Sequence, residues 1–187
     1  MSRNRVPAIL LLLVAIASVQ AGASLAKELF PGLGPSGTSG LRLVFASLLL
    51  LAAFRPRPWR FGARQWRAVA PYGVALGGMN VAFYEALARI PLGLAVTLEF
   101  VGPLGVALFG SRRPADFAWV ILAGAGIALI APWEGSAAAV DPLGVALALL
   151  AGGCWAAYIV AGGRVSSVLT EGESVTAGML VATLVVL

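Results

Sequence analysis

Chemically reactive side chains are scarce in this chain of 187 residues. It contains no histidine and a single cysteine, Cys154. These absences exclude a disulfide framework, a histidine–cysteine metal site and a Ser-His-Asp triad within the chain. The segments between the apolar runs hold no clustered nucleophile, no set of metal ligands and no phosphate-binding loop. We therefore predict that the chain is not an enzyme and that it uses no metal or cofactor.

Charged residues are also few. Only 11% of the residues are charged, 60% are hydrophobic, and the mean hydropathy is +0.94. Soluble domains do not have this composition. The isoelectric point near 10.4 would suit a nucleic-acid partner, but the basic residues punctuate apolar runs instead of gathering on one soluble face, so we expect no nucleic acid. The composition predicts an all-α, polytopic helical membrane protein surrounded by a lipid bilayer.

Six apolar runs approach the roughly 20 residues that a bilayer core requires, and a seventh run begins after them. A signal peptide is an alternative interpretation of the first run, but the five that follow favour an uncleaved membrane anchor. The predicted spans are Pro7–Leu25, Gly37–Phe54, Ala68–Leu87, Leu92–Phe109, Phe117–Ala131 and Leu143–Gly162, with the seventh opening near Gly172.

The distribution of basic residues predicts the orientation of these spans. If the N-terminus lies inside, ten arginines fall on the inner side and only Lys27 and Arg89 on the outer side. Arg42, within the second span, completes the thirteen basic residues. We therefore predict a cytoplasmic N-terminus. The inner arginines are Arg3, Arg5, Arg55, Arg57, Arg60, Arg64, Arg67, Arg112, Arg113 and Arg164.

An acidic residue inside the fourth span carries the first functional signal. Glu99 lies in a long apolar run, where a charge costs roughly 2.5–3.5 kcal/mol on insertion scales. Pro103, four residues downstream, has no N–H to donate to the carbonyl of Glu99, so we predict a helix break there. Freed carbonyls together with a charge mark a water-lined pathway more often than a structural plug. The coincidence indicates transport.

Other polar residues lie at a similar depth in neighbouring spans. With a rise of 1.5 Å per residue, Arg42 and Glu99 both lie roughly 8–11 Å below the outer boundary. Asn80 and Gln20 have similar positions in the third and first spans, which makes one polar layer from four helices. The predicted substrate-binding or proton-coupling residues are Glu99, Arg42, Asn80, Gln20, Tyr84, Trp155 and Tyr158.

Each of these residues also has a structural interpretation, and both interpretations stay open. Arg42 and Glu99 form an ion pair that only neutralises the two charges, or Arg42 extends outward toward water. In the structural interpretation, Asn80 and Gln20 form hydrogen bonds between helices. Trp155 and Tyr158, on the sixth span, would then pack in the core. Gly73 and Gly77, four residues apart, indicate close helix packing.

Several short motifs carry a family resemblance from the first span to Tyr158. They are Ala23-Ser-Leu-Ala-Lys-Glu-Leu-Phe30, Gly77-Gly-Met-Asn80 with Phe83-Tyr84, Ile90-Pro-Leu-Gly93, Leu98-Glu-Phe-Val-Gly-Pro-Leu104 and Ser111-Arg-Arg-Pro-Ala-Asp116. In this order and spacing they resemble the threonine/homoserine exporters of the drug/metabolite transporter superfamily, which contain EamA domains. The resemblance implies a bacterial-type inner-membrane exporter of small neutral amino acids or related metabolites, exchanging them for protons. It also implies ten helices in two five-helix repeats of opposite orientation.

That plan divides the chain into three parts. Residues 1–131 form the first EamA repeat with helices 1–5, residues 132–142 an outer loop, and residues 143–187 an incomplete second repeat with helix 6 and part of helix 7. We therefore expect an N-terminal fragment, whose cavity is completed by the missing C-terminal half or by a second copy in a homodimer. A weak similarity between Thr38-Ser-Gly40 and Thr176-Ala-Gly178 is compatible with two repeats.

Two functions follow from the sequence. In the first, the chain is a secondary active exporter in which Glu99 exchanges a proton and Arg42 holds either Glu99 or the substrate carboxylate. In the second, it is a membrane assembly protein whose glycine-rich helices pack without transporting anything. The location of the polar layer separates the two hypotheses, because transport requires a hydrated cavity and assembly a dry helix contact.

Overall fold

The computed structural model describes residues 5–110, 114–130 and 140–187, and every regular element in these ranges is helical. Arg3, Arg112 and Arg113, as well as most of the predicted outer loop 132–142, lie outside the described residues. The helices are α1 (Arg5–Glu28), α2 (Phe30–Phe54), the short 3₁₀-helix η1 (Pro58–Arg60), α3 (Ala63–Leu87), α4 (Leu92–Glu99), α5 (Val101–Gly110), α6 (Pro114–Ile130), α7 (Pro142–Val165) and α8 (Glu171–Val186).

The prediction of an all-α membrane protein is confirmed. Three helical segments among the described residues are long and apolar enough to cross a membrane, namely Phe30–Phe54, Leu92–Gly110 and Pro142–Val165. The second of these corresponds to α4 and α5 together, because the predicted fourth span is not one continuous helix. α3 is as long as α2, but it includes charged residues at both ends.

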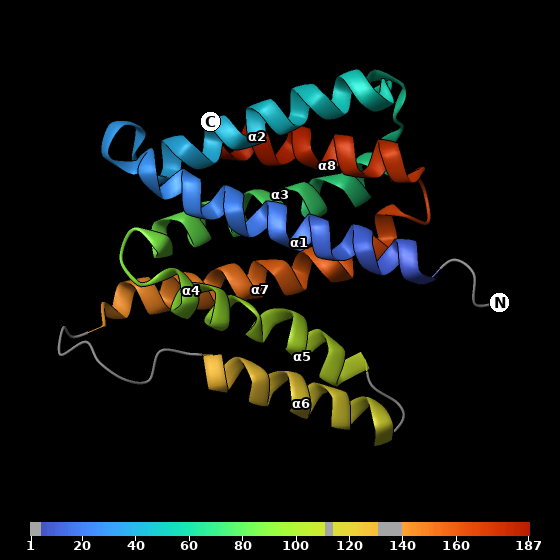
Figure 1. Ribbon diagram of the computed structural model, residues 1–187. Coiled ribbons are helices and arrows are strands. Elements are labelled where there is room, and N and C mark those ends of the chain that lie inside the picture. Colours follow the sequence, from blue (N-terminus) through green and yellow to red (C-terminus); the bar gives the residue numbers. More distant parts are fainter. Residues whose placement is uncertain (1–4, 111–113, 131–139) are drawn as a thin grey trace.

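The helices lie lengthwise beside one another, and the chain reverses direction at two ends (Figure 1). The connections from α2 to α3 and from α7 to α8 lie at the right-hand end of this view, and those from α1 to α2 and from α3 to α4 lie at the left-hand end. The described arginines between Arg55 and Arg67 therefore lie at the end opposite Lys27 and Arg89. This separation is the pattern used above to predict the orientation.

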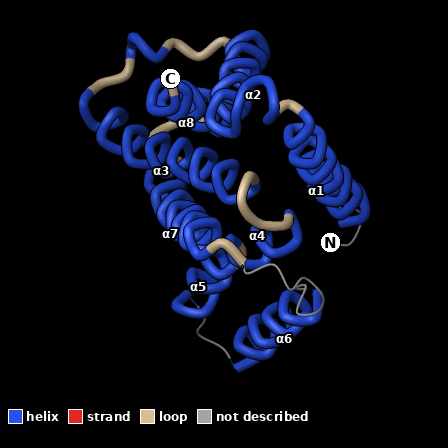
Figure 2. Tube along the Cα trace, turned by 90° about the vertical axis from the view of Figure 1, so that its left-hand side faces the viewer, coloured by secondary structure: helices blue, strands red, loops and turns tan. Residues whose placement is uncertain are grey.

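The centre of the bundle is α3, which packs against α7 and α8, while α2 packs against α8. α5 packs against α7, and α6 lies beyond α5 at the periphery (Figure 2). Small residues permit these close approaches. A Cβ atom at Gly77 would lie 3.0 Å from the carbonyl oxygen of Ala182, and one at Gly73 would lie 2.7 Å from that of Gly178, both on α8. The predicted packing role of this glycine pair is confirmed.

α2 and α8 run antiparallel to each other. Gly40, in the first half of α2, faces Val186 near the end of α8, whereas Phe54 at the end of α2 lies against Gly172 at the start of α8. α2 is also kinked at Gly34, whose φ of 70° is open to glycine and strained for other residues.

The two threonine motifs noted in the sequence have the same local structure. Thr38 Oγ1 donates to the carbonyl of Gly34 at 2.8 Å, and Thr176 Oγ1 donates to the carbonyl of Gly172 at 2.7 Å. Both threonines are buried. The two segments of similar sequence therefore lie on two antiparallel, directly packed helices.

Candidate functional site

A cavity of about 490 Å³ lies in the middle of the bundle. Five of the seven predicted site residues line it: Gln20, Arg42, Asn80, Glu99 and Trp155. The other lining residues are Ala15, Ile16, Val19, Ala23, Leu43, Ala46, Leu76, Met79, Phe83, Val96, Phe100 and Met179. The polar layer inferred from depth along the sequence therefore faces a cavity formed by α1, α2, α3, α4, α7 and α8.

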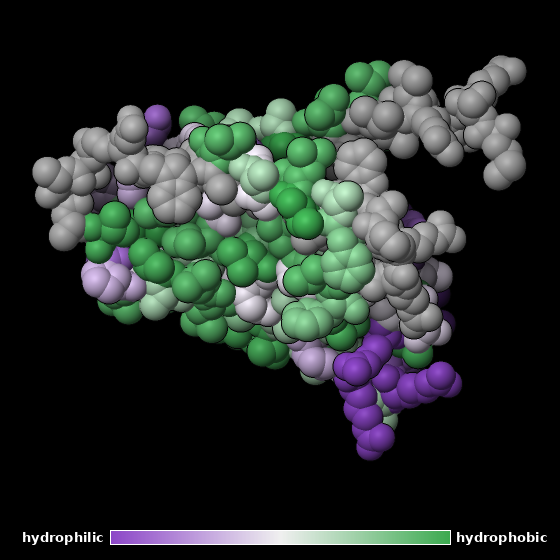
Figure 3. All heavy atoms as spheres, turned by 90° about the horizontal axis from the view of Figure 1, so that it is seen from below, coloured by the Kyte–Doolittle hydropathy of each residue, from purple (hydrophilic) through white to green (hydrophobic). Residues whose placement is uncertain are grey.

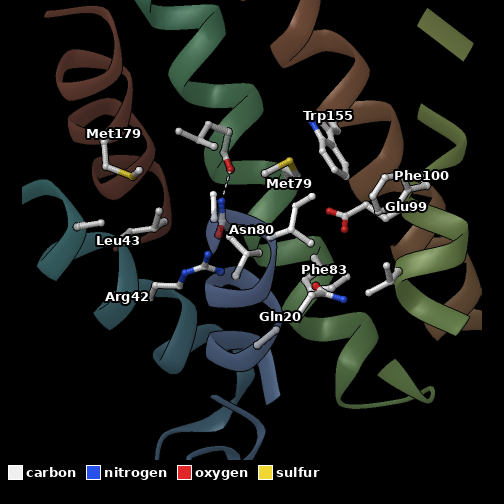
Figure 4. Close-up of a pocket in the computed structure, with 17 residues that line it drawn as sticks. Gln20, Arg42, Leu43, Met79, Asn80, Phe83, Glu99, Phe100, Trp155 and Met179 are labelled. Atoms are coloured by element: carbon white, nitrogen blue, oxygen red, sulfur yellow. Dashed lines mark hydrogen bonds between the residues drawn. The ribbon is translucent and has the colours of Figure 1, made fainter. Parts of the chain in front are cut away.

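Glu99 is the last residue of α4, and Phe100 separates it from α5. Pro103 lacks the N–H that would otherwise continue the hydrogen bonds of α4 to the carbonyl of Glu99. That carbonyl packs against Gly152 of α7, where a Cβ atom would lie only 2.6 Å from its oxygen. The carboxylate points into the cavity, and the residue as a whole is 8% exposed (Figure 4). The end of a helix and one glycine contact thus position the acid.

Arg42 approaches the cavity from the opposite wall, on α2 (Figure 4). Its Nη1 donates to Tyr84 Oη at 3.1 Å, and its guanidinium carbon lies 5.8 Å from the centroid of the Tyr84 ring. Within the described residues, no ion pair joins Arg42 to Glu99; the ion pairs found there both belong to Arg89. The pairing of Arg42 with Glu99 considered from the sequence is therefore not formed in this structure.

Tyr84 supports Arg42 from behind and is not a lining residue of the cavity. Its side chain is fully buried, and its ring packs 6.0 Å from the ring of Phe30 and 6.3 Å from that of Phe83, centroid to centroid. A buried phenol fixed by aromatic neighbours holds the guanidinium in one place, and the other guanidinium donors have no hydrogen-bond partner among the described residues.

The two amides contribute differently. Asn80 is buried, and its Nδ2 donates to the carbonyl of Leu76 on its own helix at 2.9 Å. Gln20 is exposed on α1. Within the described part of the chain, neither side chain hydrogen-bonds to another helix, so the structural interpretation of these amides as a link between helices does not apply here.

The two aromatic residues predicted on the sixth span lie in different places. Trp155 lines the cavity and contacts Phe100 edge to face, with ring centroids 5.1 Å apart. Tyr158 does not line it: its ring stacks on Tyr72 at 4.6 Å, and its hydroxyl accepts a hydrogen bond of 2.9 Å from Tyr72 Oη. Tyr158 therefore belongs to the packing between α3 and α7.

The chain is 50% identical over 178 residues to the threonine/homoserine exporter RhtA of Escherichia coli K12, a match of 95% of this chain and 60% of the relative. It is 52% identical over 156 residues to the exporter of the same name from Salmonella typhimurium LT2, covering 83% of this chain and 53% of the relative. The chain is homologous to the threonine/homoserine exporters. No family model and no solved structure matches it.

This homology confirms the resemblance identified from the motifs, and it covers most of the chain but only about 60% of the relative's length. The relatives are named as exporters, which places them among transporters rather than enzymes. The described residues include no group of three or more metal-ligating side chains. The cavity lined by Arg42 and Glu99 thus belongs to a chain that is homologous to exporters.

Sequence reasoning missed most of the apolar lining of this exporter homologue. On α1 the signal was available, because Ile16, Val19, Gln20 and Ala23 follow the spacing of one helix face and all line the cavity. For apolar residues of the other helices no comparable signal exists, since a leucine that lines a cavity and one that faces lipid look alike in a sequence.

Proposed function

We propose that the chain forms the substrate- and proton-binding part of a secondary exporter of small neutral amino acids such as threonine and homoserine. The exporter lies in a bacterial-type inner membrane with its N-terminus in the cytoplasm. One observation carries this proposal: a cationic and an anionic side chain, Arg42 and Glu99, enter one cavity from opposite walls without pairing. The names of the relatives and the separation of basic residues between the two ends support it.

The two charges match the two ends of an amino acid. The Arg42 guanidinium, held by Tyr84, binds the substrate carboxylate through its free donors. The Glu99 carboxylate binds either the substrate ammonium or a proton, and the two compete for the same oxygens. Occupation by one therefore releases the other, which is the requirement for exchange across the membrane. The amides of Asn80 and Gln20 lie in the same cavity and offer hydrogen bonds to a hydroxyl on the substrate side chain.

The alternative of a packing protein without transport receives less support. Its glycine contacts exist, but Gly73 and Gly77 pack against α8 and do not line the cavity. A dry contact between helices would bury the polar layer, whereas Arg42 and Gln20 are exposed. The location of the polar layer therefore favours transport.

We also propose the two-repeat plan for this chain. Residues 1–131 make up the first repeat, residues 132–142 an outer loop, and α7 and α8 belong to the second. The antiparallel packing of α2 on α8, together with the similarity of Thr38-Ser-Gly40 to Thr176-Ala-Gly178, supports this division. In this plan the exposed side of the cavity, next to Arg42 and Gln20, is covered by further helices of the second repeat or by a second copy of the chain.

The proposal is tested by transport in proteoliposomes. The chain is joined to the part of the E. coli relative that the match leaves out, and this chimera is called the completed exporter below. We expect saturable release of labelled threonine or homoserine, driven by an imposed pH gradient, from vesicles with the completed exporter. Release no faster than from empty vesicles, although the chimera is inserted and folded, would refute the proposed function. Saturable release by the 187-residue chain alone would show that a covering segment is unnecessary.

A double substitution separates binding by Arg42 from charge compensation. We expect Arg42→Met in the completed exporter to lose transport and stability, because it leaves Glu99 without a nearby cation. The double variant Arg42→Met with Glu99→Met is expected to regain stability but not transport, since the buried acid is removed together with the cation that faces it across the cavity. Thermal unfolding in detergent and threonine release are measured on the same preparations. Recovery of both quantities in the double variant would show that the two charges only compensate each other.

Tyr84→Phe tests the support of Arg42. The substitution keeps the ring that packs on Phe30 and removes the hydroxyl that accepts from Arg42. A hydrogen bond to a charged group contributes about 1.5–3 kcal/mol to stability, so we expect the free energy of unfolding to fall by at most this amount. We also expect threonine binding to weaken, because the guanidinium is no longer held in one place. Binding is measured with labelled threonine on purified protein. Unchanged affinity would mean that Tyr84 does not position the guanidinium.

A further inference from the structure

The connection from α2 to α3 has a composition unlike the rest of the chain. Residues 55–67, called the arginine loop below, read Arg-Pro-Arg-Pro-Trp-Arg-Phe-Gly-Ala-Arg-Gln-Trp-Arg. Five of these thirteen residues are arginines and two are tryptophans, with no lysine and no acidic residue. A role in setting orientation requires positive charge of either kind. Five arginines and two tryptophans within thirteen residues are denser than orientation alone requires, and this combination indicates recognition of a particular group.

The arginine loop is an ordered structure. Arg55 ends α2 in a left-handed conformation with φ of 46°, and the 3₁₀-helix η1 begins two residues after Pro56. The N–H of Arg60 donates to the carbonyl of Arg57 at 2.9 Å. At the start of α3, the N–H of Gly62 donates to Gln65 Oε1 at 2.7 Å. The guanidinium groups are therefore carried on a fixed backbone.

The charges of this loop have no partner among the described residues. All five arginines are exposed, and neither described ion pair involves any of them. Glu171 and Glu173 lie at the same end of the bundle, at the start of α8, and Glu173 accepts a hydrogen bond of 2.8 Å from Thr170. Figure 3 shows strongly hydrophilic residues gathered at the end where Figure 1 places this connection, beside an apolar middle.

Aromatic residues of the arginine loop lie next to these charges. Trp59 is 77% exposed, and Trp66 is 38% exposed with its ring 5.8 Å from that of Phe61, centroid to centroid. Tryptophan is enriched at the level of lipid headgroups, because its ring is apolar and its N–H is polar. The loop follows directly on a helix long and apolar enough to span a membrane, so these rings and the guanidinium groups lie at the boundary between membrane and water.

We propose that the arginine loop is a binding surface for the phosphate headgroups of anionic phospholipids. The planar guanidinium matches a phosphodiester through two parallel hydrogen bonds, which a lysine ammonium does not. Arg64 also lines a shallow groove of about 370 Å³ with Gln65, Ser167 and Val168, between the start of α3 and the turn from α7 to α8. This groove gives one headgroup a defined place beside Arg64, while the exposed tryptophans insert between neighbouring lipids.

The test uses the unmodified 187-residue chain in phosphatidylcholine vesicles and does not depend on transport. Spin-labelled phosphatidylglycerol or spin-labelled phosphatidylcholine is added, and the motionally restricted fraction gives the relative association of each lipid with the protein. Because both leaflets contain the same lipids, the orientation of the chain does not affect this readout. We expect phosphatidylglycerol to be preferred and the preference to fall as salt is raised.

Three variants locate the interaction. The triple substitution Arg57→Gln, Arg60→Gln and Arg64→Gln is expected to lower the affinity about fivefold for each arginine that touches a headgroup. Lysine at the same three positions keeps the charge and is expected to retain only part of the preference. Lys27→Gln, at the opposite end, serves as the matched control and leaves it unchanged.

Two outcomes would overturn the proposal. The first is equal association of the two lipids with the unmodified chain, which would leave only a role in orientation. The second is an unchanged preference for phosphatidylglycerol in the triple glutamine variant, which would place the interaction elsewhere on the chain.

Discussion

Glu99→Gln is expected to abolish proton-coupled export by the completed exporter while leaving its fold intact. Glutamine has the shape of the glutamate side chain but neither carries the charge nor exchanges the proton. Glu99 forms no described ion pair whose loss would destabilise the protein, and its backbone position is set by the end of α4 and by Gly152. The measured quantities are threonine release under a pH gradient and thermal unfolding in detergent.

Glu28→Gln is the matched control for this experiment. Glu28 is the last residue of α1, is exposed, and does not line the cavity. We expect its substitution to leave both the rate and its dependence on the pH gradient unchanged. If Glu99→Gln releases threonine at the unmodified rate with the same pH dependence, Glu99 has no part in coupling and the acid serves only the structure.

Gly152→Leu is expected to destabilise the protein by about 3 kcal/mol and to abolish substrate binding. A side chain at this position meets the carbonyl of Glu99 at 2.6 Å and the backbone N of Gly102 at 3.3 Å, and neither backbone can yield without moving α4 and α5 away from α7. This movement of α4 would shift the Glu99 carboxylate away from its position opposite Arg42 in the cavity. Thermal unfolding and binding of labelled threonine measure the two effects.

The next residue provides the control. Gly153 is exposed, and a Cβ atom placed on it has no other atom within 4 Å. Gly153→Leu adds the same side chain to the same helix without a clash, and we expect it to change stability by less than about 0.5 kcal/mol. Similar losses in the two variants would show that the α5–α7 contact does not determine the position of Glu99.

Much of this architecture is local and therefore readable in the sequence. Hydropathy located the helices, because the length of a span follows from the thickness of the bilayer and the rise per residue. The break after Glu99 follows from the chemistry of Pro103, which acts on the residue four positions earlier. The common depth of Arg42, Glu99, Asn80 and Gln20 follows from counting residues, and the structure places all four around one cavity.

The contacts between helices could not be predicted from the sequence. Depth along a helix says nothing about rotation around it, so Tyr158 was grouped with the site although it faces Tyr72. In the same way, Tyr84 turned out to hold Arg42 from behind the cavity wall. These assignments depend on which helix face packs against which neighbour.

The amino-acid sequence by itself determined the helical membrane fold, the helix break and the depth of the charged layer, because each follows from properties of one segment and its solvent. Only the tertiary structure decided that Arg42 binds Tyr84 instead of Glu99, and that Gly152 positions the carbonyl of Glu99. Both depend on side-chain reach and backbone approach between helices that are distant in sequence, where distances of a few tenths of an ångström separate a contact from a clash.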